Sequence, residues 1–113
     1  MTTKYRNKKT VVNGITFDSY AEAARYVWLQ RMAADGEIRD LQCHVPIVLA
    51  PSVFLRGASR KTPALRYFAD FRYTDKHGQQ VIEDVKGGPL TTAYKIKRHL
   101  MAVQGVFITE IRS

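Results

Sequence analysis

The sequence contains a single cysteine, Cys43, so it can form no internal disulfide and no cysteine-rich zinc site. No histidine is placed as an obvious partner for Cys43, which favours a structural thiol over a nucleophile. No apolar run approaches the roughly 20 residues that a membrane-spanning helix needs. The basic first residues lack the apolar segment of a secretory signal. We therefore expect a cytoplasmic protein with no membrane partner.

Two glycine-rich phosphate-binding patterns are also missing. The chain has neither GxxxxGK[ST] nor GxGxxG, so nucleotide hydrolysis by a P-loop is unsupported. The three histidines, His44, His77 and His99, show no metal-ligand spacing, and solvated or hydrogen-bonded roles suit them better.

Acidic residues are scarce relative to basic ones. The chain has 10 Asp and Glu against 18 Lys and Arg, a formal net charge of +8. This balance favours a polyanionic partner, and nucleic acid is favoured over a membrane surface because no strongly amphipathic anchor is visible. A soluble basic domain without such a partner is the alternative.

The 113 residues suffice for one domain with one core, and a hydrophobic fraction of 45% is ordinary for a soluble protein. Residues 1–10 (MTTKYRNKKT) are basic and almost free of apolar side chains, which predicts a mobile N-terminal segment. Residues 11–113 then form a single domain, without internal repeats or linkers.

Turn and cap signals divide this domain into elements. Asn13-Gly14 predicts a small hairpin over 11–17. Ser19 and Glu22 form a capping box that opens a helix to about Ala34, before Gly36. The residues expected to be buried on this helix are Ala24, Val27, Trp28 and Met32.

The second half of the chain alternates strands with one more helix. A strand is expected over 37–51, at an edge or with a bend because of Pro46, followed by a short strand over 52–55. A hairpin over 67–87 turns at 75–78. Thr91 or Thr92 then caps a helix to about Val103, and a final strand covers 106–111. On that helix the expected buried residues are Ala93, Ile96, Leu100 and Val103. The order of the expected elements is helix, strands, central hairpin, helix and strand.

Three residues of the 67–87 hairpin stand out chemically. Asp84 and Lys86 are two apart in one strand and share a face, and hairpin pairing can bring Asp70 beside them. Two carboxylates and an ammonium suit a divalent cation, with the lysine facing a water or a phosphate. The alternative is a surface salt bridge between cross-strand neighbours.

Two glutamates near this cluster are ambiguous. The capping box accounts for Glu22 without any catalytic role, yet its helix could present the carboxylate to a metal. Glu83 neighbours Asp84 but points to the opposite face, so we expect it to be structural or supporting.

Basic side chains that could bind the phosphate backbone of a nucleic acid lie in three places. For the three cations of the polar loop expected over 56–63, simple solvation is the alternative. The candidates are Lys8 and Lys9 near the N-terminus, Arg56, Arg60 and Lys61 in the loop, and Lys95, Lys97 and Arg98 on the second helix.

Glu22, Asp70 and Asp84-x-Lys86 together resemble the PD-(D/E)XK nuclease superfamily, which has the restriction-endonuclease-like fold. The segments KYRNKK, GITFDSYAEAARY, GEIRDLQ, YFADFRY, EDVKG and YKIKRHLM resemble a family of small phage and prophage proteins that is labelled a domain of unknown function and grouped with Holliday junction resolvases. The resemblance covers nearly the whole chain.

The superfamily implies an α/β (α+β) fold with a restriction-endonuclease-like core, in which helices flank a mixed central β-sheet. It also implies Mg²⁺- or Mn²⁺-dependent hydrolysis of phosphodiester bonds. Carried over, Asp70 and Asp84 are metal ligands, Val85 belongs to the metal site with them, Lys86 handles the water, and Glu22 completes the acidic cluster. Ala69 replaces the proline of the motif, and Asp84 stands where archaeal resolvases commonly have glutamate.

The resemblance implies an endonuclease for DNA, with branched duplex as the expected substrate, in phage recombination or DNA processing. Two alternatives remain open: a nicking or end-processing nuclease for linear duplex, and a non-catalytic DNA-binding or phage assembly protein. A homodimer is expected because a four-way junction needs two cuts near a two-fold axis, and residues 47–55 are its candidate surface, unless the second helix covers them.

Overall fold

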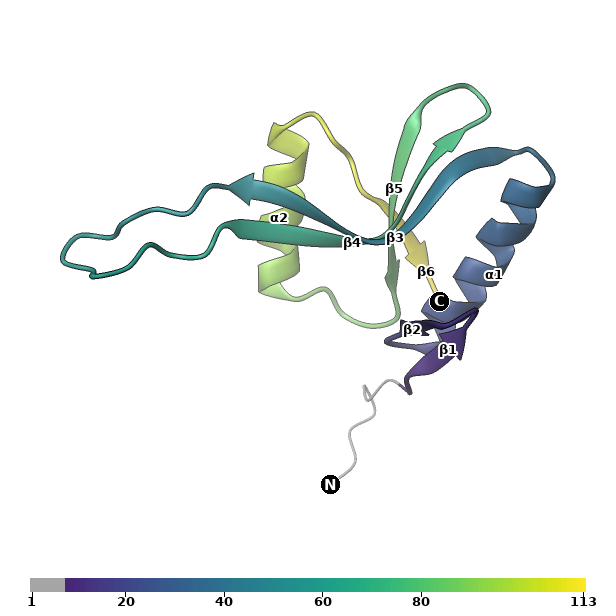
Figure 1. Ribbon diagram of the computed structural model, residues 1–113, viewed down its shortest axis with the longest axis horizontal. Coiled ribbons are helices and arrows are strands. Elements are labelled where there is room, and N and C mark those ends of the chain that lie inside the picture. Colours follow the sequence, from purple (N-terminus) through teal and green to yellow (C-terminus); the bar gives the residue numbers. More distant parts are fainter. Residues whose placement is uncertain (1–7) are drawn as a thin grey trace.

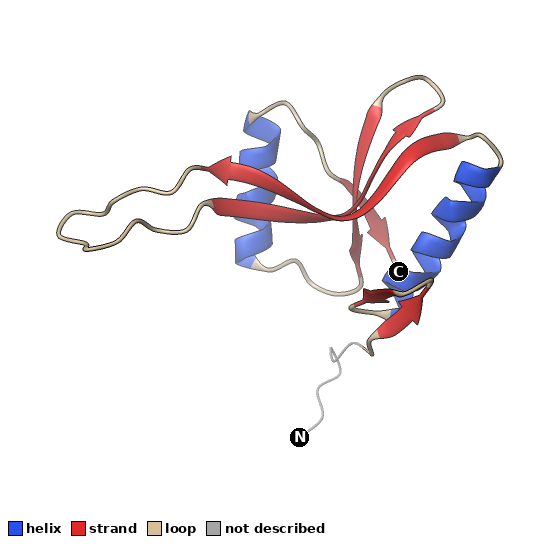
Figure 2. Ribbon diagram, in the orientation of Figure 1, coloured by secondary structure: helices blue, strands red, loops and turns tan. Residues whose placement is uncertain are grey.

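The computed structural model describes residues 8–113 and shows a mixed four-stranded sheet, a small two-stranded sheet and two helices (Figures 1 and 2). The elements in chain order are β1 (Thr10–Val12), β2 (Ile15–Phe17), α1 (Tyr20–Ala34), β3 (Ile38–Ala50), β4 (Leu65–Asp75), β5 (Gln80–Lys86), α2 (Thr92–Val103) and β6 (Thr109–Arg112).

The large sheet has the strand order β3-β4-β5-β6. Its first two pairings are antiparallel, and β5 pairs in parallel with β6 after the chain crosses over through α2. A parallel pair needs such a crossover, which explains why a helix separates these two strands. The predicted α+β fold with a mixed sheet flanked by helices is confirmed, and Pro46 does lie in an edge strand, β3.

Local signals set most of the element boundaries as expected. The hairpin β1–β2 turns at Asn13 and Gly14, both with positive φ. Ser19 caps α1 by accepting a hydrogen bond from the Glu22 main-chain N–H, at 3.1 Å. Thr91 caps α2 in the same way, accepting from the Tyr94 N–H at 3.1 Å. These caps satisfy main-chain donors that the first helical turn leaves free.

The turn between β4 and β5 also forms where it was predicted. Asp75 accepts hydrogen bonds on Oδ1 from the main-chain N–H groups of His77 and Gln79, each at 2.9 Å. Gly78 takes the left-handed conformation, with φ of 79°, that this turn requires. The 52–55 strand, however, is absent: Phe54 makes only an isolated bridge to Lys61. The last strand, β6, begins three residues later than expected.

The predicted buried stripe of α1 is wrong. The buried side chains are Ala23, Tyr26 and Leu29, which pack with Phe17 and Phe71 in a core under α1. Ala24, Val27 and Trp28 are exposed instead, and Met32 is only partly buried. α1 carries apolar residues on adjoining faces, so periodicity alone did not show which face meets the sheet.

The predicted stripe of α2 is wrong for a related reason. Tyr94 and Met101, two turns apart, are the buried residues, and they pack with Tyr67, Ala69 and Ile82 in a second core. Ala93, Ile96 and Val103 are exposed, and Leu100 is partly buried. A tyrosine at the core position leaves the aliphatic residues on the solvent face.

One part of the molecule projects away from both cores. The ends of β3 and β4 and the loop between them extend well beyond α2 as a long hairpin (Figure 1). We call residues 46–68 the arm. The radius of gyration is 16.3 Å, compared with about 13 Å for a compact domain of this length. The arm accounts for much of this extension.

Candidate functional site

The candidate site lies where β4 and β5 separate. Their antiparallel register includes the pair Phe71 and Glu83, so the next position places Asp70 opposite Asp84. At that point the Val85 N–H donates to the Asp70 carboxylate, with a distance of 2.7 Å to Oδ2, and main-chain pairing between the strands ends. The hairpin therefore brings the two predicted aspartates together at a divergence of strands.

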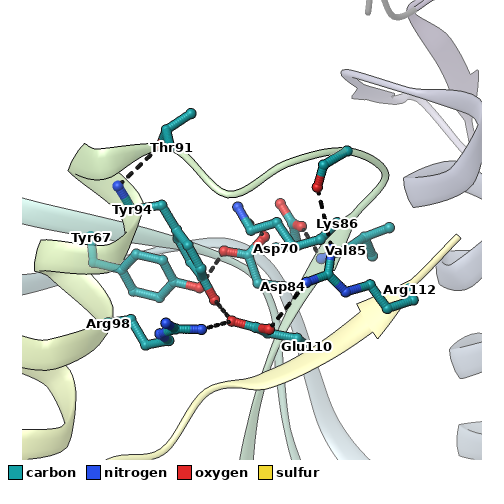
Figure 3. A network of polar contacts seen from close by, with 11 residues as sticks. Tyr67, Asp70, Asp84, Val85, Lys86, Thr91, Tyr94, Arg98, Glu110 and Arg112 are labelled. Atoms are coloured by element: carbon teal, nitrogen blue, oxygen red, sulfur yellow. Dashed lines mark hydrogen bonds and ion pairs between the residues drawn. The ribbon is translucent and has the colours of Figure 1, made fainter.

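Asp84 is buried, and both of its oxygens have partners. The Tyr67 hydroxyl donates to Oδ2 at 2.6 Å, and Lys86 Nζ lies 3.2 Å from Oδ1. The Lys86 ammonium also sits 3.7 Å from the centre of the Tyr94 ring (Figure 3). Because a cation over an aromatic face is attracted to its π electrons, the ring and the carboxylate together fix the lysine.

Asp70 lies in an environment that disfavours its charge. Burial, with the nearby carboxylates of Asp84 and Glu22, raises the pKa of Asp70 to about 8, against a smaller opposing effect of the Val85 N–H. Burial also raises the pKa of Glu22, and Asp18 and Asp84 add to the effect. The carboxylates of Glu22, Asp70 and Asp84 thus influence one another, as expected of a cluster that a cation would stabilise.

Glu22 takes part both in the cap and in the site. Its main-chain N–H supplies the capping hydrogen bond to Ser19, which leaves its side chain directed toward the aspartates. The carboxylate lines a hollow of about 360 Å³. The lining residues are Glu22, Tyr67, Phe68, Asp70, Asp84, Val85, Lys86, Thr91, Ala93, Tyr94 and Lys97. All four residues predicted to be catalytic therefore meet in one place.

His44 was not predicted as a site residue, yet it borders this cluster. It lies in β3 between the pairs Cys43–Phe71 and Val45–Ala69, so it faces the Asp70 position across the strands. Its φ of 54° is unusual for a residue other than glycine, and its Nε2 lies 4.0 Å from Glu22 Oε1. Strained backbone of this kind often occurs at functional sites. A histidine within a strand pattern gives no sequence signal of such a conformation.

A further polar network, centred on Glu110 of β6, borders the site beyond Tyr94. Glu110 Oε2 accepts hydrogen bonds from the Tyr94 hydroxyl at 2.7 Å and from Arg98 Nη1 at 2.9 Å (Figure 3). Arg112 lies 3.8 Å from the other oxygen. Hydrogen bonding to Tyr94, together with Arg98, lowers the pKa of Glu110. This network joins α2 to β6 and holds the tyrosine ring against Lys86.

Glu83 lies on the opposite face, as predicted, and has a structural setting. Its carboxylate is buried and accepts two hydrogen bonds from Arg25 of α1, at 2.8 and 2.7 Å, and one from the Tyr73 hydroxyl. The Arg25 guanidinium in turn packs 4.4 Å from the Trp28 ring centre. This pair ties α1, the helix that presents Glu22, to β5, the strand that presents Asp84.

The predicted phosphate-binding residues fall into different settings. Lys97 lines the hollow, whereas Lys95 borders a different depression on the outer face of α2. Arg98 is held by Glu110, and Lys9 pairs with Asp18 at 3.1 Å on the surface. Lys8 is exposed, and Arg56, Arg60 and Lys61 are exposed in the arm. Residues 1–7 of the predicted N-terminal segment lie outside the described residues.

The available donors can be compared with what a hard divalent cation requires. Across residues 8–113, no three side chains of His, Cys, Asp or Glu come together as a ready-made ligand set. Mg²⁺, however, keeps several waters and binds through one or two carboxylates. Asp70 and Asp84 supply those, and Val85 could contribute only its main-chain oxygen. The donors present therefore fit Mg²⁺ or Mn²⁺ rather than a metal that needs a closed protein cage.

Comparison with known proteins identifies the family. No curated protein and no solved structure matches the chain. In the described part of the chain, neither helix has the length and apolar character needed to cross a bilayer. One family model, "Protein of unknown function (DUF1064)", matches residues 2–112. Because this match spans nearly the entire sequence, the chain belongs to the DUF1064 family.

Proposed function

We propose that this protein is a metal-dependent DNA endonuclease of the PD-(D/E)XK type. The observation that carries the proposal is the meeting of Glu22, Asp70, Asp84 and Lys86 where β4 and β5 separate. The formal net charge of the whole chain, +8, suits a polyanionic substrate. A surface salt bridge between cross-strand neighbours explains the cluster less well. Asp84 is buried rather than on the surface, and Asp70 lies beside other carboxylates rather than beside a cation.

Each residue of the cluster has a separate role in the proposed reaction. Asp70 and Asp84 would hold Mg²⁺ or Mn²⁺, which when bound supplies positive charge for the phosphate and lowers the pKa of a bound water. Lys86, whose ammonium lies 3.7 Å from the centre of the Tyr94 ring, would orient the attacking water or donate to a phosphate oxygen. Glu22 contributes negative charge from α1, and Lys97 on the rim can bind a neighbouring phosphate.

Branched duplex is the substrate that the family resemblance favours, with a role in phage recombination or DNA processing. Resolving a four-way junction takes two cuts, and one chain has one acidic cluster. The proposal therefore includes a homodimer with two sites. A nicking or end-processing enzyme for linear duplex and a non-catalytic DNA-binding or phage assembly protein are the competing functions.

One experiment separates these functions. A fluorescently labelled four-way junction and a linear duplex of the same sequence are each incubated with the protein and Mg²⁺. Paired cuts confined to the junction support a resolvase, and equal cutting of both substrates supports the general nuclease. Tight binding without any cutting, in Mg²⁺ or Mn²⁺, would leave only the non-catalytic function.

A further inference from the structure

The arm contains no acidic residue, and its charge therefore has one sign. Between Asp40 and Asp70 the sequence has no Asp or Glu, yet it has Arg56, Arg60, Lys61 and Arg66. The three cations of the loop and Arg66 are all exposed. A surface of this kind attracts a polyanion. The arm carries it beyond α2, as the long hairpin in Figure 2 shows.

Large apolar side chains are interleaved with these cations. Phe54 and Leu55 near the arm tip are 62% and 61% exposed, and Phe68 near its base is 60% exposed. Lys61 Nζ lies 5.7 Å from the Phe54 ring centre, so a cation and an aromatic ring lie side by side on this surface. Aromatic rings next to cations are the combination by which proteins bind unpaired nucleic-acid bases.

The loop of the arm has a defined shape. Val53 and Thr62 exchange two hydrogen bonds, at 2.7 Å between main-chain atoms and at 3.0 Å from the Val53 N–H to the Thr62 hydroxyl. The Ala58 N–H donates to the Leu55 carbonyl at 3.0 Å, beside Gly57 with φ of 79°. These hydrogen bonds hold Phe54 and Lys61 opposite each other near the tip of the hairpin.

The arm leads directly into the candidate site. Arg66, Phe68 and Asp70 alternate along β4, so they project from the same face of the strand. Phe68 and Asp70 both line the hollow that contains the acidic cluster. From Asp70 back to Lys61 the chain spans at most about 30 Å, at about 3.3 Å per residue. This length is enough for several nucleotides.

We infer that the arm binds an unpaired or splayed stretch of DNA next to the scissile phosphate, with Phe68 and Phe54 stacking on bases and the four cations contacting phosphates. This inference rests on the proposed function and narrows its substrate to DNA with unstacked bases beside the cut. A second copy of the chain is the other possible occupant of the arm. Two arms packed together would place four cations against four, without an acidic partner.

Binding in the absence of divalent cations tests this inference without requiring cleavage. The full chain and the double variant Phe54→Ala/Phe68→Ala are titrated by fluorescence anisotropy against a splayed fork, a single strand and a continuous duplex. The double variant should lose about tenfold or more in affinity for the fork and the single strand, and less than about twofold for the duplex. Arg60→Gln/Lys61→Gln should instead weaken all three and reduce the salt slope by roughly one per contact.

Two matched controls come from outside the arm. Phe107, which is 76% exposed, lies after α2, and Phe107→Ala should leave fork binding unchanged. Arg39 is exposed near the far end of β3, and Arg39→Gln is the control for charge. In addition, Phe54→Trp keeps a stacking ring, so it should preserve fork affinity and its fluorescence should be quenched by the single strand. This last measurement does not depend on folding of the alanine variants.

The outcomes separate the two proposals. Equal losses for fork and duplex, no loss, or an unquenched Trp at position 54 would overturn the inference about the arm. Sedimentation showing that Phe54→Ala/Phe68→Ala converts a dimer to a monomer, with DNA selectivity unchanged, would assign the arm to self-association instead. Arm-dependent fork binding by a protein that cuts nothing would contradict the proposed nuclease while supporting the arm as a DNA contact.

Discussion

Asp70 is a partly buried carboxyl group beside two other carboxylates, and its raised pKa of about 8 has a consequence for stability. The folded protein retains this proton up to about pH 8, whereas the unfolded chain releases it near pH 4. The free energy of unfolding should therefore fall as pH rises through this window, by at most about 1.4 kcal/mol per pH unit. Urea unfolding between pH 5 and pH 9, without divalent cations, measures this slope.

Asp70→Asn should flatten that pH dependence, because the amide does not ionise. Millimolar Mg²⁺ should flatten it in the unmodified protein, since a bound cation favours the ionised carboxylate. Asp35→Asn, which removes an exposed carboxylate at the end of α1, serves as the control and should retain the original slope. A free energy of unfolding that increases between pH 5 and pH 8 would contradict the raised pKa of Asp70.

Tyr67 would act on the proposed metal site through Asp84, because its hydroxyl donates a hydrogen bond of 2.6 Å to the Asp84 carboxylate. Tyr67→Phe removes that donor and keeps the ring in the core. We expect the Mg²⁺ concentration for half-maximal cleavage to rise by roughly 10- to 100-fold, as when other partners of metal-binding carboxylates are lost. Tyr20→Phe alters an exposed tyrosine and should have no effect. An unchanged Mg²⁺ requirement in Tyr67→Phe would separate this hydroxyl from the metal site.

At the level of elements, the Arg25–Glu83 pair should determine how firmly α1 is held against β5. Arg25→Ala would leave the buried Glu83 carboxylate without its cation, and we expect a loss of about 3–5 kcal/mol in unfolding free energy. Lys9→Ala breaks an exposed pair, with both side chains more than 70% exposed, and should cost less than about 1 kcal/mol. Urea unfolding of both variants provides the comparison, and similar losses would contradict the assigned role of the buried pair.

The elements show which parts of the structure local sequence can determine. Caps at Ser19 and Thr91, and turns at 13–14 and 75–78, act over a few residues, and each formed where predicted. The buried faces of both helices were mispredicted, because they depend on contacts with strands distant in the chain. The arm was missed for the same reason: its strands are joined by a 14-residue connection, 51–64, without the regular pattern of a hairpin.

The candidate site was predictable to the extent that one hairpin builds it. Asp70, Asp84 and Lys86 lie within 17 residues, and simple antiparallel pairing brings them together. For Glu22 the sequence left two roles open, helix capping and presentation of its carboxylate to a metal, and the family resemblance favoured the second. Tyr67 and Tyr94, which hold Asp84 and Lys86, gave no separate signal, because aromatic residues in strands and helices ordinarily read as core.

At the scale of the whole molecule, the distribution of positive charge should set how tightly DNA is held. Lys97→Gln, on the rim of the hollow, should weaken duplex binding and reduce the slope of log affinity against log salt by roughly one. Lys95 was also a predicted phosphate contact, but it borders a depression on the outer face of α2 rather than the hollow, so we now expect Lys95→Gln to leave the slope unchanged. Equal effects of the two substitutions would mean that the bound DNA does not follow the face that contains the acidic cluster.

The central claim is that Asp84 and Lys86 perform phosphodiester cleavage, and a supercoiled plasmid assay with Mg²⁺ tests it most directly. The unmodified protein should nick or linearise the plasmid, and Asp84→Asn and Lys86→Ala should each reduce the rate by at least about 100-fold. Thermal unfolding and metal-free DNA binding should show both variants to be folded and able to bind, because affinity depends mainly on phosphate contacts elsewhere. Cleavage by Asp84→Asn at the rate of the unmodified protein would contradict the account.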